Sequence, residues 1–169
     1  MVGRPFSSRR AWALILLASG SVPPGLDRVT LSKLRHVLRG KDLWSIRPRL
    51  ASRAKHRELR AHSSDLPRLE AEAGVLRTGA RSAAAAGLGL VAPDAPVELY
   101  LDASTAERLV VRYRLRPSDR PNVVLHVVSA DVRSWLSGPV APWPAVALDL
   151  ADSRDPRSQG VARELLSRA

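Results

Sequence analysis

Proline and glycine interrupt this chain at short intervals, and their spacing limits the length of any helix or strand. The 169 residues include 13 Pro and 10 Gly, which end regular elements or mark turns. This favours many short elements over a long helical bundle. A chain of this length encloses one ordinary core or two small domains. Only 4% of the residues are aromatic, so aliphatic side chains have to fill that core.

Positive charge is concentrated at the start of the chain. Residues 1–62 contain 14 Lys or Arg against three acids, whereas residues 63–169 contain 13 Arg and 13 acids. The first 62 residues therefore carry the whole net charge of +11, an asymmetry that indicates a polyanion or membrane partner. We expect a basic helical segment over 1–62 and a neutral domain over 63–169, or one continuous domain.

The apolar run over residues 11–18 has two interpretations. Three arginines before it and small residues after it outline a secretory signal, and Arg9-Arg10 hints at a twin-arginine type. The run is too short to span a membrane, which takes about 20 apolar residues. The alternative is a buried helix over 8–19, with Ser7 or Ser8 as N-cap and Gly20 as its stop. The helix is the favoured interpretation, and the absence of cysteine fits a reducing interior.

Two further helices are expected in the basic segment. Leu31, Leu34 and Leu38 fall on one face of a helix over 30–39, with Thr30 as its cap and cations on the other face. An apolar stripe likewise predicts a helix over 43–58, started or kinked by Pro48. The basic segment is therefore read as short amphipathic helices with cationic outer faces.

The neutral part mixes strand and helix patterns, and the expected fold class is α+β. Strands are predicted at 75–79, at 97–101, where apolar and polar residues alternate, and at 122–128, an almost wholly apolar and therefore central strand. Helices are predicted at 64–69, 80–86, 104–113 behind a Ser104–Glu107 capping box, and from Asp155-Pro156 onward. Residues 139–144 are expected to form a loop, and 146–150 a short apolar element.

No pattern for catalysis or metal binding is evident. A dinucleotide loop, a Walker-type phosphate loop and a nucleophile elbow are all missing. The four histidines lack the spacing of metal ligands, because zinc takes about four convergent donors. Asp152 and Asp155 read as helix-capping residues. We therefore expect a protein that is not an enzyme and that needs no metal or cofactor.

The cations of the basic segment are the better candidates for function. Lys and Arg bind phosphates with release of counterions and without reading sequence. A solvated, arginine-rich helix surface is the equally weighted alternative. Aromatic residues are not interleaved with the arginines, which argues against base stacking on single strands. The candidate nucleic-acid contacts are Lys33, Arg35, Arg39, Arg47, Arg49, Arg53, Lys55, Arg57 and Arg60.

Four short stretches, in order along the chain, resemble one family. They are Arg60–Leu69; Arg77–Ala83 with Gly87-Leu88; Tyr113–Leu115 with Asn122–Leu125; and Ala147–Leu150 with Asp155–Arg157. They resemble the C-terminal domain of AbiEi-type antitoxins from bacterial type IV toxin–antitoxin systems, and the lead-in over 3–14 resembles actinobacterial members. The motif positions are His62, Asp65, Gly79, Ser82, Asn122, Asp149, Asp155 and Arg157.

The resemblance implies a cytoplasmic, non-catalytic transcriptional regulator whose partners are duplex DNA and a cognate nucleotidyltransferase-type toxin. The family usually carries a DNA-reading headpiece, and here that module would end before Met1. DNA contact is then expected from the basic segment, through the phosphate backbone. The alternatives are a protein-interaction module that docks an acidic partner, or an exported protein with an N-terminal signal.

Overall fold

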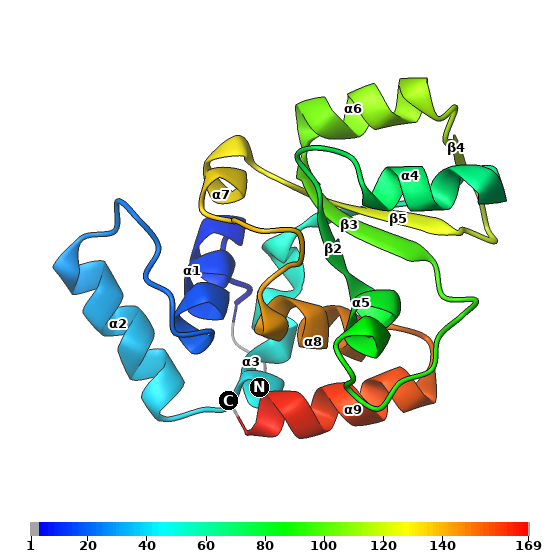
Figure 1. The fold of residues 1–169 in the computed structure, drawn as a ribbon. Helices are drawn as coiled ribbons and strands as arrows, with labels where there is room; N and C mark the ends of the chain where they lie inside the picture. Colours follow the sequence, from blue (N-terminus) through cyan, green and yellow to red (C-terminus); the bar gives the residue numbers. More distant parts are fainter. Residues whose placement is uncertain (1–3, 169) are drawn as a thin grey trace. The chain divides into compact units, whose positions relative to one another are not determined.

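The protein has a mixed α+β fold, as expected. The computed structural model describes residues 4–168, which form nine α-helices, two 3-10 helices and one five-stranded sheet (Figure 1). The fold divides into two compact units. Unit 1 contains residues 1–53 and 142–169, and unit 2 contains residues 54–141. The change in charge at residue 62 therefore falls inside unit 2.

Unit 1 is helical and discontinuous in sequence. It contains α1 (Ser8–Ala18), α2 (Arg28–Arg39), α3 (Leu43–Ile46), the 3-10 helix η1 (Arg47–Arg53), α8 (Trp143–Asp152) and α9 (Pro156–Ser167). Helix α1 contacts α2, η1 and α8, and α9 contacts α8 and α3. Residues from the two ends of the sequence therefore share one core.

Helix α1 is the core helix predicted from the first apolar run. Ser7 caps it, and Gly20, at a φ of 83°, ends it as expected. The amide of Ser21 donates to the carbonyl of Leu16, which completes a glycine-terminated helix end. All six residues from Ala11 to Leu16 are buried. No helix in the described part of the chain is long and apolar enough to cross a membrane.

Unit 2 contains the sheet, in the order β2-β3-β5-β1-β4. The strands are β1 (Lys55–Arg60), β2 (Leu76–Thr78), β3 (Val97–Asp102), β4 (Arg116–Pro117) and β5 (Val123–Val128). β3 and β5 are parallel, and the other pairs are antiparallel. β5 lies at the centre, as its apolar sequence predicted.

Two helices of unit 2 cover one face of this sheet. The helices of unit 2 are η2 (Ser63–Asp65), α4 (Leu66–Glu70), α5 (Gly79–Ala85), α6 (Ala103–Arg112) and α7 (Ala130–Ser134). Leu69 of α4 and Leu109 of α6 join Leu99, Val123 and Leu125 in one buried cluster. Figure 1 shows α4 and α6 on the same side of the strands.

The prediction of a helix over 43–58 is wrong. Helix α3 ends at Ile46, residues 47–53 form the 3-10 helix η1, and residues 55–60 form strand β1. β1 pairs with β5 over five residues and with β4 on its other edge. Lys, Arg, Glu and Leu favour helices, but two ladders of backbone hydrogen bonds override this local preference.

Smaller differences concern element boundaries. Asp27, not Thr30, caps α2, and Asp102, not Ser104, caps α6. Helix α8 begins at Trp143, so the expected loop over 139–144 is shorter and the apolar element 146–150 lies inside a helix. Pro144 fits there because the first helical turn needs no amide donor. Strand β4 and helix α7 had no predicted counterpart.

Candidate nucleic-acid interface

Helix α2 presents most of its surface to solvent. Leu34 is its one buried residue, with Leu31 and Leu38 half-buried beside it. Asp27 caps the helix: its Oδ1 accepts from the Thr30 amide at 2.8 Å and its Oδ2 from the Thr30 hydroxyl at 2.6 Å. The hydroxyl of Thr30 and its amide lower the pKa of Asp27. The cap and the leucine stripe hold α2 in place and leave its outer faces open.

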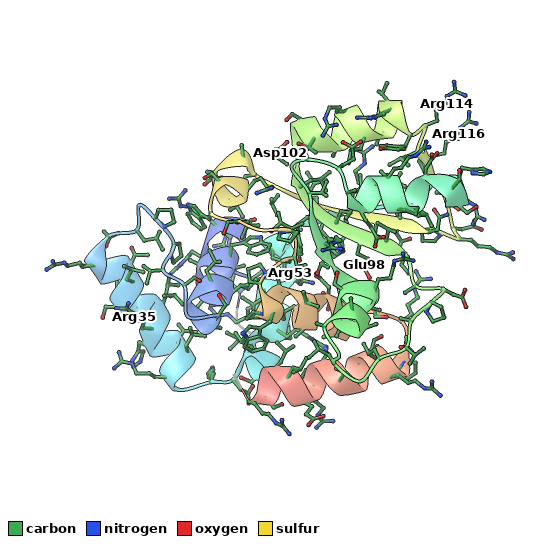
Figure 2. The ribbon with its side chains drawn as sticks, viewed as in Figure 1. Arg35, Arg53, Glu98, Asp102, Arg114 and Arg116 are labelled. Carbon is green, nitrogen blue, oxygen red and sulfur yellow. The ribbon has the colours of Figure 1, made fainter. Side chains whose placement is uncertain are left out.

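The outer faces of α2 are cationic. Arg28, Arg35 and Arg39 are spaced by seven and four residues, so they form a row about 16 Å long on one side of the helix. Lys33 lies on the opposite flank, and Lys41 follows the helix. All five are exposed. Figure 2 shows Arg35 on α2.

These five cations have no ion pair among the described residues, and the carboxylates nearest in sequence are engaged elsewhere. Asp27 caps α2, and Asp42 caps α3 by accepting from the Ser45 amide at 2.6 Å. The imbalance extends to the whole unit. Unit 1 contains 15 Lys or Arg and six acids, whereas unit 2 contains 12 and ten. The surface of unit 1 therefore carries positive charge that the chain itself does not neutralise.

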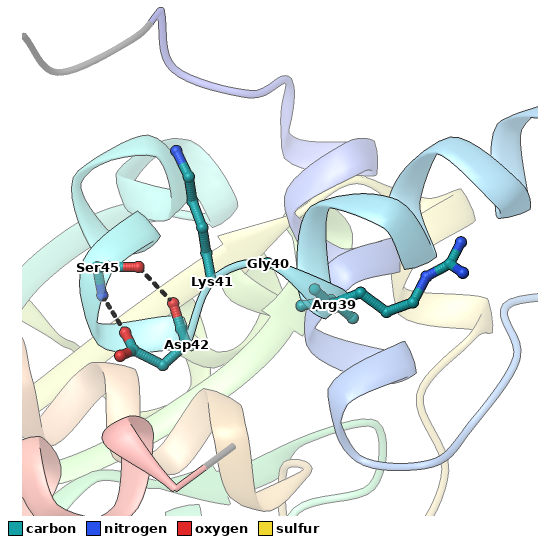
Figure 3. Close-up of a pocket in the computed structure, with 6 residues that line it drawn as sticks. Arg39, Gly40, Lys41, Asp42 and Ser45 are labelled. Atoms are coloured by element: carbon teal, nitrogen blue, oxygen red, sulfur yellow. Dashed lines mark hydrogen bonds between the residues drawn. The ribbon is translucent and has the colours of Figure 1, made fainter.

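An open depression of about 610 Å³ lies where α2 ends and α3 begins. Arg39, Lys41, Asp42 and Ser45 line it together with Leu38 and Gly40. In Figure 3 the ends of the Arg39 and Lys41 side chains point in different directions, and Asp42 and Ser45 are joined by two hydrogen bonds. The depression is cationic at its rim, but these side chains do not converge on one point.

Two other predicted contacts stack on aromatic rings of unit 1. The guanidinium of Arg47 lies 4.5 Å from the centroid of the Trp44 ring, and that of Arg49 lies 3.9 Å from the Phe6 ring. Both arginines are half-buried. Cation–π contacts of this kind hold the guanidinium against its own unit. Arg47 and Arg49 are therefore less available to an external anion than the cations of α2.

Arg53 does not belong to an exposed face. It is 0% exposed, and its Nη2 contacts Asp149 Oδ1 at 2.6 Å and Asp152 Oδ2 at 2.7 Å. Its carbonyl accepts hydrogen bonds from the indole nitrogen of Trp12 and the hydroxyl of Ser8. A phosphate cannot reach a guanidinium enclosed in this way. The prediction of Arg53 as a nucleic-acid contact is therefore wrong, and its role is structural.

The remaining three predicted contacts lie on strand β1 in unit 2 and not on a helix. Lys55 and Arg60 are exposed, whereas half-buried Arg57 forms a 2.6 Å ion pair with Glu107 of α6. The nine predicted residues are thus divided between two units, and they do not form one helical surface. Arg28 and Lys41 were not predicted as contacts, because both lie outside the helix that was expected over 30–39.

Several of the eight family-motif positions have identifiable structural roles. His62 accepts from the Ser64 amide, and Asp155 caps α9 through Ser158. The hydroxyl and amide of Ser158 lower the pKa of Asp155. Asn122 binds both the amide and the carbonyl of Ala61, at 2.8 and 2.9 Å.

The other positions divide between core and surface. Gly79 is buried at a φ of 71°, and Asp149 is the buried partner of Arg53. Ser82 is half-buried in α5, Asp65 lies 3.8 Å from Arg68, and Arg157 is exposed in the first turn of α9. Most of these positions therefore serve the fold rather than forming one surface.

Unit 2 also contains a polar cluster that the sequence did not predict. His126 Nε2 lies 2.9 Å from Glu98 Oε2, across the parallel strands β3 and β5. The His126 ring contacts the rings of His56 and Tyr100. No group of three or more His, Cys, Asp or Glu residues in the described part of the chain could hold a metal ion.

Comparisons of the chain with models of protein families, with curated proteins and with solved structures found no match. The candidate interface therefore rests on the charge, exposure and hydrogen bonding of the residues themselves.

Proposed function

We propose that the protein is an antitoxin-like regulator of a bacterial type IV toxin–antitoxin system, and that it contacts the phosphate backbone of duplex DNA through helix α2. It acts in the cytoplasm without catalysis, and its protein partner is a nucleotidyltransferase-type toxin. The order of the four family-like stretches supports the class of regulator. The exposed cations of α2, which have no ion pair among the described residues, support the contact with DNA.

Charge and geometry suit the backbone better than the bases. Each Lys or Arg that neutralises a phosphate releases counterions, which favours binding at low salt. The row of Arg28, Arg35 and Arg39 runs along one side of a helix, where several phosphates can be met at once. Arginine forks bind phosphate oxygens in pairs but carry no sequence information at these positions. We therefore expect binding that depends on salt and only weakly on sequence.

The test measures the affinity for a random duplex of about 20 base pairs by fluorescence anisotropy at several salt concentrations. Replacing Arg35 and Arg39 by Gln removes two phosphate contacts. The slope of log K against log salt is negative, and its magnitude should decrease by about two. Because both residues are exposed and unpaired, the free energy of unfolding should change by less than about 0.5 kcal/mol.

The matched control replaces Arg154 and Arg157 by Gln. Both are exposed residues of unit 1 outside α2, so the net charge changes equally. The control should keep the wild-type slope. An equal loss in both variants would show that only net charge matters, and it would contradict a site on α2.

The partner is tested separately, by co-expression with the product of the adjacent gene. An antitoxin restores growth to cells that produce its toxin. If both the wild type and the α2 variant restore growth, the protein neutralises the toxin through a surface other than α2. Growth restored by neither, with an active toxin, would refute the antitoxin function. Co-purification of an acidic protein that is lost in the α2 variant would instead favour a docking module.

A further inference from the structure

Four exposed arginines of unit 2 gather where α6, β4 and the end of β1 meet. They come from four adjoining segments: β1, the α6–β4 link, β4 and the β4–β5 link. We call them the arginine corner: Arg60, Arg114, Arg116 and Arg120. Figure 2 shows Arg114 and Arg116 projecting outward at this corner.

The sheet places two of these arginines against each other. Arg60 of β1 lies directly opposite Arg116 of β4 in the antiparallel register. Like charges at directly opposed positions destabilise a pair of strands. Arg60 also donates from Nη1 to the carbonyl of Arg120 at 2.8 Å. This hydrogen bond holds the β4–β5 link beside β1. The fold therefore concentrates positive charge here at a cost in stability.

Arg114 adds a second cost. Its φ of 50° lies in the left-handed region, and it is the one non-glycine residue described there. It ends α6: its amide donates to the carbonyl of Val111, and the next amide, of Leu115, donates to that of Val110. Glycine is the usual residue at this position, because the left-handed conformation strains any side chain. The chain has a strained arginine where a glycine would fit without cost.

Internal acids do not compensate for these charges. None of the corner arginines forms an ion pair within residues 4–168, and neither do their charged neighbours Glu58 and Asp119. Elsewhere in unit 2 five arginines form ion pairs, and Arg77 and Arg133 donate to backbone carbonyls. The pairs are Arg57 with Glu107, Arg68 with Asp65, Arg81 with Glu70, and both Arg108 and Arg112 with Glu72. The corner therefore gathers four arginines that have no acid partner in the described part of the chain, and an external anion could bind them.

We infer that the arginine corner is a second nucleic-acid contact, which binds phosphate oxygens of the DNA backbone. A protein partner would need an apolar centre that excludes water, and Val111 is the one large apolar side chain exposed on α6 beside the corner. Phosphates need only the guanidinium groups. This inference rests on the proposed function for the identity of the polyanion, but on different residues in a different unit.

The test uses the full chain, the same random duplex and a variant with Arg114→Gly and Arg116→Gln. The slope of log K against log salt should fall by about two, as for the α2 variant. Arg114→Gly also relieves backbone strain, so the midpoint of thermal unfolding should rise by about 2 °C. Weaker binding by a more stable protein cannot result from unfolding.

A variant that combines the α2 and corner substitutions separates the two sites. If both sites bind DNA, the magnitude of the slope for this combined variant should decrease by about four. The Arg154→Gln, Arg157→Gln control should keep the wild-type slope. A wild-type slope in the corner variant, with a reduced slope in the α2 variant, would overturn the corner and leave the proposed function intact. The reverse pattern would support the corner and contradict α2. A wild type that does not bind DNA at low salt would overturn both.

Discussion

Gly79 shows how one small residue can hold a polar cluster together. Its backbone is left-handed, and a Cβ built there would lie 2.2 Å from Oε1 of Glu98. The other oxygen of Glu98 binds His126. A side chain at position 79 would therefore meet both a strained backbone and a carboxylate that is already engaged. This close approach accounts for a glycine at position 79.

Gly79→Ala should lower the free energy of unfolding by about 2 kcal/mol or more, because strain and overlap add. The matched control is Gly87→Ala, at a φ of 73° with nothing within 4 Å of the added Cβ. The control should cost only the strain, about 1 kcal/mol. Denaturant unfolding measures both variants. Equal losses would show that Glu98 moves aside freely.

At the scale of elements, α6 is attached to the loop after α4 through Glu72. The Glu72 carboxylate accepts from the Tyr113 hydroxyl at 2.6 Å and pairs with Arg108 at 2.9 Å and Arg112 at 3.0 Å. The Tyr113 hydroxyl, followed by Arg108, lowers the pKa of Glu72 below its ordinary value of 4.5. The same hydrogen bond raises the pKa of Tyr113. Ionised Glu72 therefore favours the folded state.

This predicts a contribution to stability that is complete above pH 4.5 and is lost as the pH falls through the lower, folded-state pKa of Glu72. Glu72→Gln should reduce stability at neutral pH and should flatten the loss of stability below pH 4.5. Glu107→Gln, which changes an exposed ion pair with Arg57, is the control and should keep the wild-type pH profile. Denaturant unfolding from pH 3 to pH 7 checks both. A Glu72→Gln profile parallel to wild type would contradict the assignment.

At the scale of the whole molecule, the Arg53 cluster joins the two ends of the chain within unit 1. Arg53 ends η1, whereas Asp149 and Asp152 lie on α8, almost 100 residues later. Asp149 is 0% exposed at its side chain and Asp152 is 39% exposed. Removing the buried partner leaves the guanidinium poorly compensated, whereas the exposed partner can be replaced by water.

Asp149→Asn should therefore destabilise the protein by about 3 kcal/mol or more. Asp152→Asn should cost less than about 1 kcal/mol, because that carboxylate is partly screened by solvent. Thermal and denaturant unfolding compare the two isosteric changes. Similar small effects would show that Arg53 is compensated by other groups.

Much of the fold was predictable because its signals are local. The cap and glycine stop of α1, the alternating pattern of β3, the apolar run of β5 and the Asp-Pro start of α9 each lie within a few residues. The candidate site was predictable in part. Exposed charge at helical spacing indicated Lys33, Arg35 and Arg39 on α2, but nothing local distinguished them from Arg53.

The sequence by itself determined the class of the fold, the ends of α1, the start of α9 and the excess of positive charge in the first third of the chain. Caps, turns and apolar periodicity act over short distances, so they can be read directly. Only the tertiary structure decided that residues 55–60 form a strand, because their partners lie on β5 and β4. It also decided which arginines are buried, paired or exposed, because the carboxylate that neutralises each one is supplied by a different part of the chain.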